Sequence, residues 1–381
     1  PPTAVFTNEP EYGRLFIHYQ HHRGLPEIAT DSLSYSPFKS FEMPSTIAQT
    51  PPPSCRIGIN GFGRIGRNVF RASLLRSDVV VVAINHTCDS IEDLIYLIRF
   101  DSTHGTLAKL IGSDAQLDPL PNGNLIVNGR EIILHSQRDL YKLDWAASGV
   151  DYVAECTGKF KTTDLASIHT THGKARKVLI SAPSPDAPTF VFKVNSHEYD
   201  LHRDLSVFSC ASCTTNCLAP IAKVIDDNFG IAQGFMTTVH ASTQSQHVLD
   251  GYSKKNKRAG RSVMGNIIPT TTGAAQAIKI VLPQLKGKLS GTSIRVPVAN
   301  VSMVDLTINT DTVTSLDEIL RALRHASETY LSGVLCVTDD EVVSCDLLGH
   351  NSSAIIDSKA SVELNSKFFK IIAWYDNEWA Y

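Results

Sequence analysis

A glycine-rich turn near the first predicted strand constrains this 381-residue chain most. Gly61, Gly63 and Gly66 follow residues 55–60, an apolar run that predicts a strand, and they open an amphipathic helix. Residues 78–84 then predict a second, buried strand. In such a βαβ unit the glycines let a pyrophosphate approach the backbone at the N-terminus of the helix. We therefore expect a dinucleotide-binding domain with a parallel sheet, and a tight turn that binds nothing is the alternative.

The residues after the second predicted strand are unusual for a dinucleotide site. An Asp or Glu at this point normally holds the adenosine ribose, but the strand ends in Asn85, His86 and Thr87. The carboxylate that would repel a 2′-phosphate is absent, and His86, Thr87 or Arg64 could contact such a phosphate. Asn85 and a neutral His can also hydrogen-bond a plain ribose. These residues alone leave the choice between NAD and NADP open.

Two further predicted strands end in small polar residues. Thr157 follows residues 152–155, and Ser181 follows residues 178–180. Open α/β sheets bind their ligands at the carboxyl ends of the strands. Both residues are therefore expected at the same cofactor edge.

Past the middle of the chain, Cys213 and His240 are predicted to meet. Cys213 opens a predicted helix over 213–229, where free N–H groups and the helix dipole stabilise a thiolate. That helix extends roughly 24 Å at its rise per residue. The predicted strand over 231–240 returns roughly 30 Å, so His240 ends near Cys213. A Cys beside a His is an activated nucleophile, and the alternative is an inert buried Cys with a surface His.

Three downstream features indicate an anionic ligand. The basic loop over 254–261 is either a solvated face or an attraction for anionic substrate and cofactor. Hydroxyl groups over 270–272, with Gly273, precede a predicted helix near Ala274, an arrangement that binds anions. Arg295 lies on a predicted strand and could pair with a phosphate, with a cross-strand salt bridge as the alternative.

Composition excludes other classes. The net charge of −3 gives no signal for nucleic acid or an anionic membrane, and no apolar run approaches the roughly 18 residues of a membrane span. The eight cysteines form no small disulfide framework, so we expect reduced thiols and a cytoplasmic location. Residues 1–54 lack sustained periodicity and predict a mostly disordered extension, for which a mitochondrial transit peptide is a poor fit.

From about residue 55 to 381 the chain resembles phosphorylating glyceraldehyde-3-phosphate dehydrogenases. The matching stretches are INGFGRIGR from Ile59, FDSTHG from Phe100, ASCTTNCLAP from Ala211, TTVHA from Thr237, NIIP-x-x-TGAA from Asn266, RVPVANVS from Arg295 and WYDNEW from Trp374. The resemblance implies an α/β fold. A Rossmann-type domain with a doubly wound parallel sheet would span 55–211, joined by 377–381. An α+β catalytic domain with a mainly antiparallel sheet would span 212–376.

The resemblance also implies the chemistry. Cys213 would attack the aldehyde of glyceraldehyde 3-phosphate and carry a thioester, His240 would act as base, and inorganic phosphate would release 1,3-bisphosphoglycerate. One phosphate subsite would comprise Ser212, Thr214, Thr272 and Gly273, and the other Thr243 and Arg295. NAD, with NADP possible, would contact Gly61, Gly63, Arg64, Ile65, His86, Arg138, Thr157, Ser181, Asn377 and Tyr381. No metal is implied, and the loop over 242–265 implies a homotetramer.

Several residues depart from the family pattern. His86 replaces an Asp, Tyr252 a Pro, and Lys257 an aromatic residue, which leaves cofactor preference and the subunit-facing loop open. Cys210 replaces an Asn and creates Cys210-x-x-Cys213. This spacing suggests a hypothesis of reversible disulfide protection, with a small residue ahead of the helix as the alternative. Family members also continue past Tyr381 with a closing helix, so a natural end there would weaken cofactor binding.

Three alternative functions remain open at this point. The chain could be an NADP-preferring or inhibitor-resistant biosynthetic isoenzyme. It could be a non-catalytic relative with a binding or regulatory role, although that reading predicts loss of residues such as Cys213 and His240, which are present. Erythrose 4-phosphate could also be the substrate, since one carbon discriminates weakly.

Overall fold

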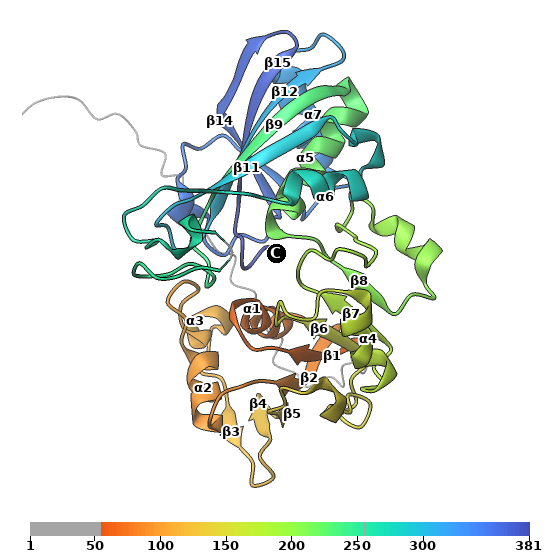
Figure 1. Ribbon diagram of the computed structural model, residues 1–381, viewed down its shortest axis with the longest axis vertical. Coiled ribbons are helices and arrows are strands. Elements are labelled where there is room, and N and C mark those ends of the chain that lie inside the picture. Colours follow the sequence, from red (N-terminus) through yellow and green to blue (C-terminus); the bar gives the residue numbers. More distant parts are fainter. Residues whose placement is uncertain (1–54, 255) are drawn as a thin grey trace, which may run out of the picture. The chain divides into compact units, whose positions relative to one another are not determined.

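The computed structural model of this protein describes residues 55–254 and 256–381 (Figure 1). The extension predicted for residues 1–54 lies outside the described residues. Strands within 55–209 form one sheet, and strands within 231–375 form another. No helix in the described ranges is both long enough and apolar enough to cross a membrane.

The first sheet has eight strands and carries the glycine-rich turn. Its region contains β1 (Cys55–Asn60), α1 (Arg64–Ser73), β2 (Val79–Asn85), α2 (Ile91–Arg99), α3 (Leu107–Ile111), β3 (Leu117–Pro119), β4 (Leu125–Val127), β5 (Arg130–His135), β6 (Tyr152–Glu155), α4 (Thr163–Thr171), β7 (Lys177–Ile180) and β8 (Val207–Ser209). The strand order is β3-β4-β5-β2-β1-β6-β7-β8. All pairs from β5 to β8 are parallel, so the predicted parallel sheet is confirmed.

The turn between β1 and α1 depends on its glycines. Gly61 has φ 93°, in the left-handed region, and its N–H donates to Asn85 O at 2.9 Å. A Cβ on Gly66 would clash with the carbonyl oxygen of Gly61. A Cβ on Gly63 would meet nothing within 4 Å. The turn therefore packs tightly at Gly66 and leaves open space at Gly63.

The second sheet has seven strands and three main helices. Its region contains α5 (Cys213–Phe229), β9 (Ile231–His240), β10 (Ile268–Thr270), α6 (Ala274–Val281), β11 (Leu289–Arg295), β12 (Ser302–Thr310), α7 (Leu316–Glu328), β13 (Leu335–Thr338), β14 (Ala354–Asn365) and β15 (Phe368–Tyr375). The strand order is β10-β11-β9-β12-β15-β14-β13. Only β11–β9 and β13–β14 are parallel, so the expected mainly antiparallel sheet is confirmed.

Helix α5 is anchored in the core of this second region. Its side chains Ile221, Val224 and Ile225 are fully buried, in one apolar cluster with Leu306 and Ile308 of β12. Helices α6 and α7 both pack on α5, and Figure 1 shows the three together beside the sheet. Burying such side chains stabilises the fold by about 1.5–3 kcal/mol each. The position of the first turn of α5 is consequently well fixed.

Candidate active site

Cys213 and His240 lie at neighbouring ends of α5 and β9. The Ser212 side chain accepts the Thr215 N–H and caps α5, so Cys213 is the first residue of the helix. The helix ends at Gly230, and β9 returns directly to His240. The Cys213 Sγ atom lies 3.5 Å from His240 Nε2. The predicted approach of the two residues is confirmed.

The second ring nitrogen of His240 faces two groups. Its Nδ1 lies 2.7 Å from Ala241 O and 2.5 Å from Nη1 of Arg295, which also donates to Ala241 O at 3.1 Å. Ala241 O can only accept, so its bond to the ring requires the tautomer with a proton on Nδ1, in which the Arg295 contact is an approach of two donors rather than a hydrogen bond. Nε2 is then free to accept a proton from Cys213. Burial and the adjacent Arg295 charge lower the pKa of His240 to about 4. The imidazole is therefore neutral at pH 7 and can act as a base.

The environment of Cys213 differs from the expectation of a thiolate. Burial raises the pKa of the Cys213 thiol, against the opposing effects of Thr214 and the Arg295 charge. Desolvation disfavours the charged form, so a resting thiolate at the start of α5 stays a prediction. Transfer of the thiol proton to His240 is then needed before attack.

Tyr375, which the sequence did not single out for the site, supports both reacting residues. Its hydroxyl lies 2.9 Å from Thr214 Oγ1 and 2.8 Å from Thr238 Oγ1. Its ring packs edge-on against His240, with centroids 6.0 Å apart. The tyrosine is buried and links α5 to β9. The only indication of this role in the sequence was that Tyr375 lies in the WYDNEW stretch.

The residues expected at the first phosphate subsite begin two helices. Ser212 caps α5, and the Thr214 hydroxyl is engaged with Tyr375. Gly273 is the N-cap residue of α6, where no side chain caps the helix, and the Thr272 hydroxyl accepts the Ala274 N–H at 3.2 Å. Backbone N–H groups at these two helix starts are therefore better placed to bind an anion than the engaged hydroxyls.

The second expected subsite contains an uncompensated positive charge. Arg295 at the end of β11 pairs in register with His240 of β9. Across the described residues, no carboxylate forms an ion pair with Arg295, so the alternative of a cross-strand salt bridge is not observed. The Thr243 hydroxyl lies 3.1 Å from Ser245 Oγ. Arg295 is thus able to receive an anion.

Arg64 is occupied by carboxylates. Its guanidinium makes ion pairs with Asp101 and Glu378, and these hold the pKa of the guanidinium above its usual value. The side chain is therefore not free for a 2′-phosphate, which differs from the sequence-based expectation. Its backbone, with that of Ile65, still opens α1 beside the glycine turn.

The remaining expected cofactor residues lie at the strand ends. His86 is buried after β2, and its Nδ1 accepts the Cys88 N–H at 3.1 Å. Thr157 donates its N–H to Glu155 Oε1 at 2.8 Å, and Ser181 Oγ donates to Glu155 O at 2.9 Å. Arg138 is exposed.

Glu155, a buried carboxylate at the end of β6 that the sequence did not indicate, connects neighbouring elements of the cofactor region by hydrogen bonds. Glu155 Oε2 accepts from Asn60 Nδ2 at 2.5 Å and lies 3.0 Å from His169 Nε2. His169 in turn accepts from Trp145 Nε1 at 2.9 Å. Nothing in the spacing of these residues predicts that they meet.

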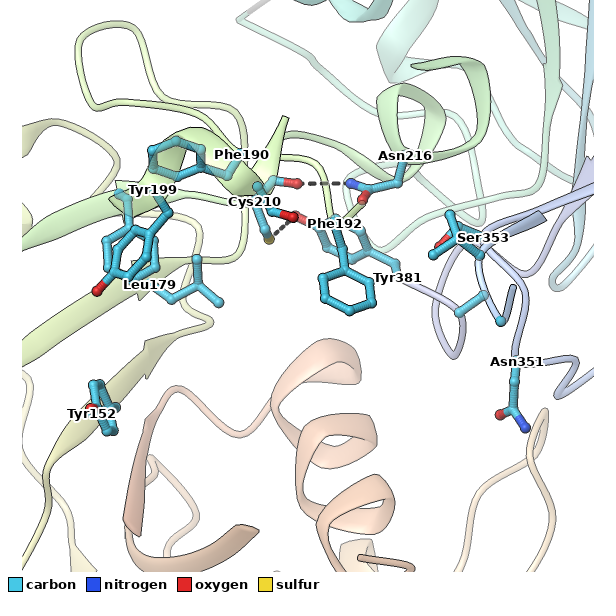
Figure 2. A pocket seen from close by; sticks show the side chains of 15 residues that line it. Tyr152, Leu179, Phe190, Phe192, Tyr199, Cys210, Asn216, Asn351, Ser353 and Tyr381 are labelled. Carbon is cyan, nitrogen blue, oxygen red and sulfur yellow. Dashed lines mark hydrogen bonds between the residues drawn. The ribbon is translucent and has the colours of Figure 1, made fainter. Parts of the chain in front are cut away.

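Tyr381 closes the far side of the Cys213 segment. Its hydroxyl donates to Ala211 O at 2.8 Å. The same hydroxyl lies 3.4 Å from Cys210 Sγ, a contact that Figure 2 shows. A cavity of about 640 Å³ opens here, lined by Cys210, Asn216 and Tyr381. Five further aromatic side chains also line it: Tyr152, Phe190, Phe192, Tyr199 and Phe208. Neither Cys213 nor His240 is among the residues that line this cavity.

The proposed redox pair is present as two thiols. Cys210 and Cys213 are both free cysteines. Burial raises the pKa of Cys210, which disfavours the thiolate needed to attack an oxidised Cys213. Reversible disulfide protection stays a prediction.

The residues present fit a dinucleotide. The open space at Gly63 is where a side chain would block a pyrophosphate, and the first-turn N–H groups of α1 face no acidic residue of that turn. In the part of the chain that the structure describes, no group of three or more His, Cys, Asp or Glu side chains could hold a metal ion.

Comparisons with known proteins agree with this geometry. A family model described as "Glyceraldehyde 3-phosphate dehydrogenase, NAD binding domain" matches residues 55–163, and the corresponding C-terminal domain model matches residues 212–377. Similar curated proteins include glyceraldehyde-3-phosphate dehydrogenase of Neurospora crassa (48% identical), glyceraldehyde-3-phosphate dehydrogenase 1 of Mucor circinelloides (50%) and glyceraldehyde-3-phosphate dehydrogenase of Schistosoma mansoni (49%). Each match covers 86% of this chain and 94% of the relative.

Proposed function

The chain belongs to the glyceraldehyde-3-phosphate dehydrogenase family, and on this premise we propose that it oxidises its substrate through a thioester on Cys213. It is an NAD-dependent oxidoreductase that converts glyceraldehyde 3-phosphate and inorganic phosphate to 1,3-bisphosphoglycerate. The observation that carries the residue assignment is the 3.5 Å separation between Cys213 Sγ and His240 Nε2.

The first step is proton transfer followed by attack. His240 Nε2 accepts the Cys213 thiol proton, and Sγ bonds to the aldehyde carbon. The N–H groups at the start of α5 then stabilise the oxyanion. When bound, NAD supplies the hydride acceptor. The imidazolium of His240 returns its proton to the oxyanion, which gives a hydroxyl group. Loss of the hydride then leaves a thioester on Cys213, and the hydroxyl proton passes back to the neutral His240.

Arg295 couples substrate binding to this proton transfer. Its Nη1 lies 2.5 Å from His240 Nδ1, and its charge is one cause of the low pKa of His240. A substrate phosphate bound to Arg295 would offset that charge and raise the basicity of His240. The base is then strongest when substrate is present.

The second step uses inorganic phosphate. A phosphate bound between the starts of α5 and α6 attacks the thioester carbonyl, and the bond to Cys213 Sγ breaks. Backbone N–H groups in the first turns of α5 and α6 supply the anion site. The product leaves as an acyl phosphate, and Cys213 regains its proton.

We also propose a homotetramer in the cytoplasm. Apolar side chains are exposed along the loop over 242–265, including Leu249 (77% exposed) and Tyr252 (88%). Exposed apolar groups of this kind favour a subunit contact. Sedimentation equilibrium checks this proposal, and a monomer at micromolar concentration contradicts it.

The decisive experiment follows NADH formation and the acyl enzyme together. With glyceraldehyde 3-phosphate and NAD, we expect sustained NADH formation only when inorganic phosphate is present. Without phosphate, mass spectrometry should find one acyl group per subunit on Cys213. Cys213→Ser should show neither signal. Phosphate-independent turnover, or an acyl group on another residue, contradicts the proposal.

A further inference from the structure

Ser302, the first residue of β12, joins two parts of the site that the sequence treats separately. Its Oγ donates to Asn377 Oδ1 at 2.7 Å and accepts the Ala241 N–H at 3.0 Å. Ser302 and Asn377 are buried, with exposed fractions of 1% and 6%. Ala241 directly follows His240, and its carbonyl accepts from His240 Nδ1 and Arg295. One hydroxyl therefore connects the base to the segment expected to hold the nicotinamide.

The donors and acceptors fix the direction of each hydrogen bond. The Ala241 N–H can only donate, so the Ser302 oxygen accepts it. The hydroxyl proton of Ser302 is donated to Asn377 Oδ1, so the oxygen of this amide, and not its NH₂ group, faces Ser302. This hydrogen bond favours one of the two orientations of the Asn377 amide. Within residues 55–254 and 256–381, Asn377 Nδ2 makes no hydrogen bond, so both of its protons are free for a ligand.

The surrounding backbone holds Ser302 and Asn377 firmly. Ser302 pairs in register with Tyr375, two residues before Asn377. The Asp376 carboxylate accepts the N–H groups of Glu378 and Trp379 at 2.9 and 2.8 Å, which fixes the turn after β15. Val301 has φ 66°, a left-handed conformation that is strained for a β-branched residue. With the backbone fixed, the rotation of the Asn377 amide depends on Ser302.

We propose that Ser302 is a positioning residue that selects which end of the Asn377 amide meets the cofactor. The Nδ2 group then donates to the carboxamide oxygen of the nicotinamide, and this sets which face of the ring receives the hydride. The proposal rests on the function proposed above, because it assumes that Asn377 faces the nicotinamide.

Loss of the Ser302 hydroxyl has two consequences for the amide. The Asn377 side chain can turn by 180° and present an oxygen to the carboxamide, which loses a hydrogen bond to NAD. Removing one such bond corresponds to about a 10-fold weaker affinity. The nicotinamide can also bind with its ring turned over, so some hydride reaches the opposite face.

The test compares Ser302→Ala with wild type by three measurements. Calorimetry should give a Kd for NAD about 10-fold higher in the variant. The KM for NAD should rise while the KM for glyceraldehyde 3-phosphate stays within about twofold, since Arg295 is unchanged. With substrate deuterated at C1, proton NMR of the reduced cofactor should show deuterium on both faces at C4, against one face in wild type.

Two further variants make the result decisive. Ser361 is a matched control, because its buried hydroxyl also donates to a carbonyl, Asp357 O, and accepts an N–H, from Ile372. Ser361→Ala should lower stability without changing NAD affinity or deuterium placement. Ser302→Thr, which keeps the hydroxyl, should restore placement on one face.

A folded Ser302→Ala with wild-type Kd and one-face transfer overturns the proposal. Wild type that binds NAD but fails to form NADH overturns the proposed function instead, and calorimetry still tests Ser302.

Discussion

The catalytic region and the cofactor region of this enzyme position their functional residues in different ways. In the catalytic region Cys213 and His240 terminate two long elements, α5 with 17 residues and β9 with 10. In the cofactor region the functional residues follow strands of three to seven residues and rely on side-chain hydrogen bonds, as Thr157 does on Glu155. The two long, packed elements fix the distance between Cys213 and His240. The short strands of the cofactor region fix the positions of the residues that follow them but allow the residue type to vary. The departures at His86 and Cys210 both lie at such strand ends.

The largest effect is expected from one substitution in the catalytic region, which should change catalysis without changing cofactor binding. His240→Asn removes the base beside Cys213, so kcat should fall by about 10²–10⁴-fold, the usual contribution of a general base. The Kd for NAD should stay unchanged because His240 lies on β9, away from the glycine turn. Steady-state kinetics and calorimetry check both values. A parallel change in kcat and Kd would show that the regions are not separable.

The pH dependence of Cys213 reactivity tests the protonation state of the catalytic pair. Burial raises the pKa of the thiol, so the thiolate fraction is small at neutral pH and grows as pH rises. His240, with a pKa of about 4, stays neutral over this range. Alkylation by iodoacetamide should accelerate about 10-fold per pH unit between pH 6 and 8. Cys213→Ser supplies the background from other cysteines. A rate already constant at pH 6 indicates a preformed thiolate–imidazolium pair.

Cofactor choice tests whether strand ends are adjustable. His86→Asp places a carboxylate after β2, where it can hold the ribose hydroxyls and repel a 2′-phosphate. The ratio of the KM for NADP to the KM for NAD should rise about 10–100-fold, equivalent to roughly 1–3 kcal/mol of repulsion. His86→Asn is the neutral control. An unchanged ratio for His86→Asp means that residue 86 does not face the ribose.

The smallest effects are expected in the glycine turn. One glycine there should affect the stability of the fold, and the other should affect NAD affinity. Gly66→Ala should destabilise the fold by about 1–3 kcal/mol, because its Cβ meets the Gly61 carbonyl. Gly63→Ala should leave the melting temperature unchanged and weaken NAD, because its Cβ enters the open space. Thermal unfolding and calorimetry separate the two outcomes. Equal melting temperatures for both variants would contradict this view of the turn.

The sequence predicted what depends on local periodicity and element length. The approach of Cys213 to His240 followed from the lengths of one helix and one strand, and the parallel sheet followed from its βαβ unit. Contacts between distant residues were not predictable. Arg64 and Glu378 are 314 residues apart in the chain, and the buried Glu155–His169 pair shows no spacing pattern. The desolvation that raises the pKa of Cys213 was not predictable either, because it depends on the whole fold.

The distance along the chain between Arg64 and Glu378 also has a consequence for protein synthesis. Chains are made from the N-terminus, and regions fold as they emerge from the ribosome. The glycine turn is among the first described segments to appear, whereas Glu378, which contacts Arg64, is made 314 residues later, and Tyr381, which contacts Cys210, follows it. NAD stabilises only a chain that can bind it. A nascent chain therefore gains the full benefit of its cofactor only when translation has delivered residues 377–381.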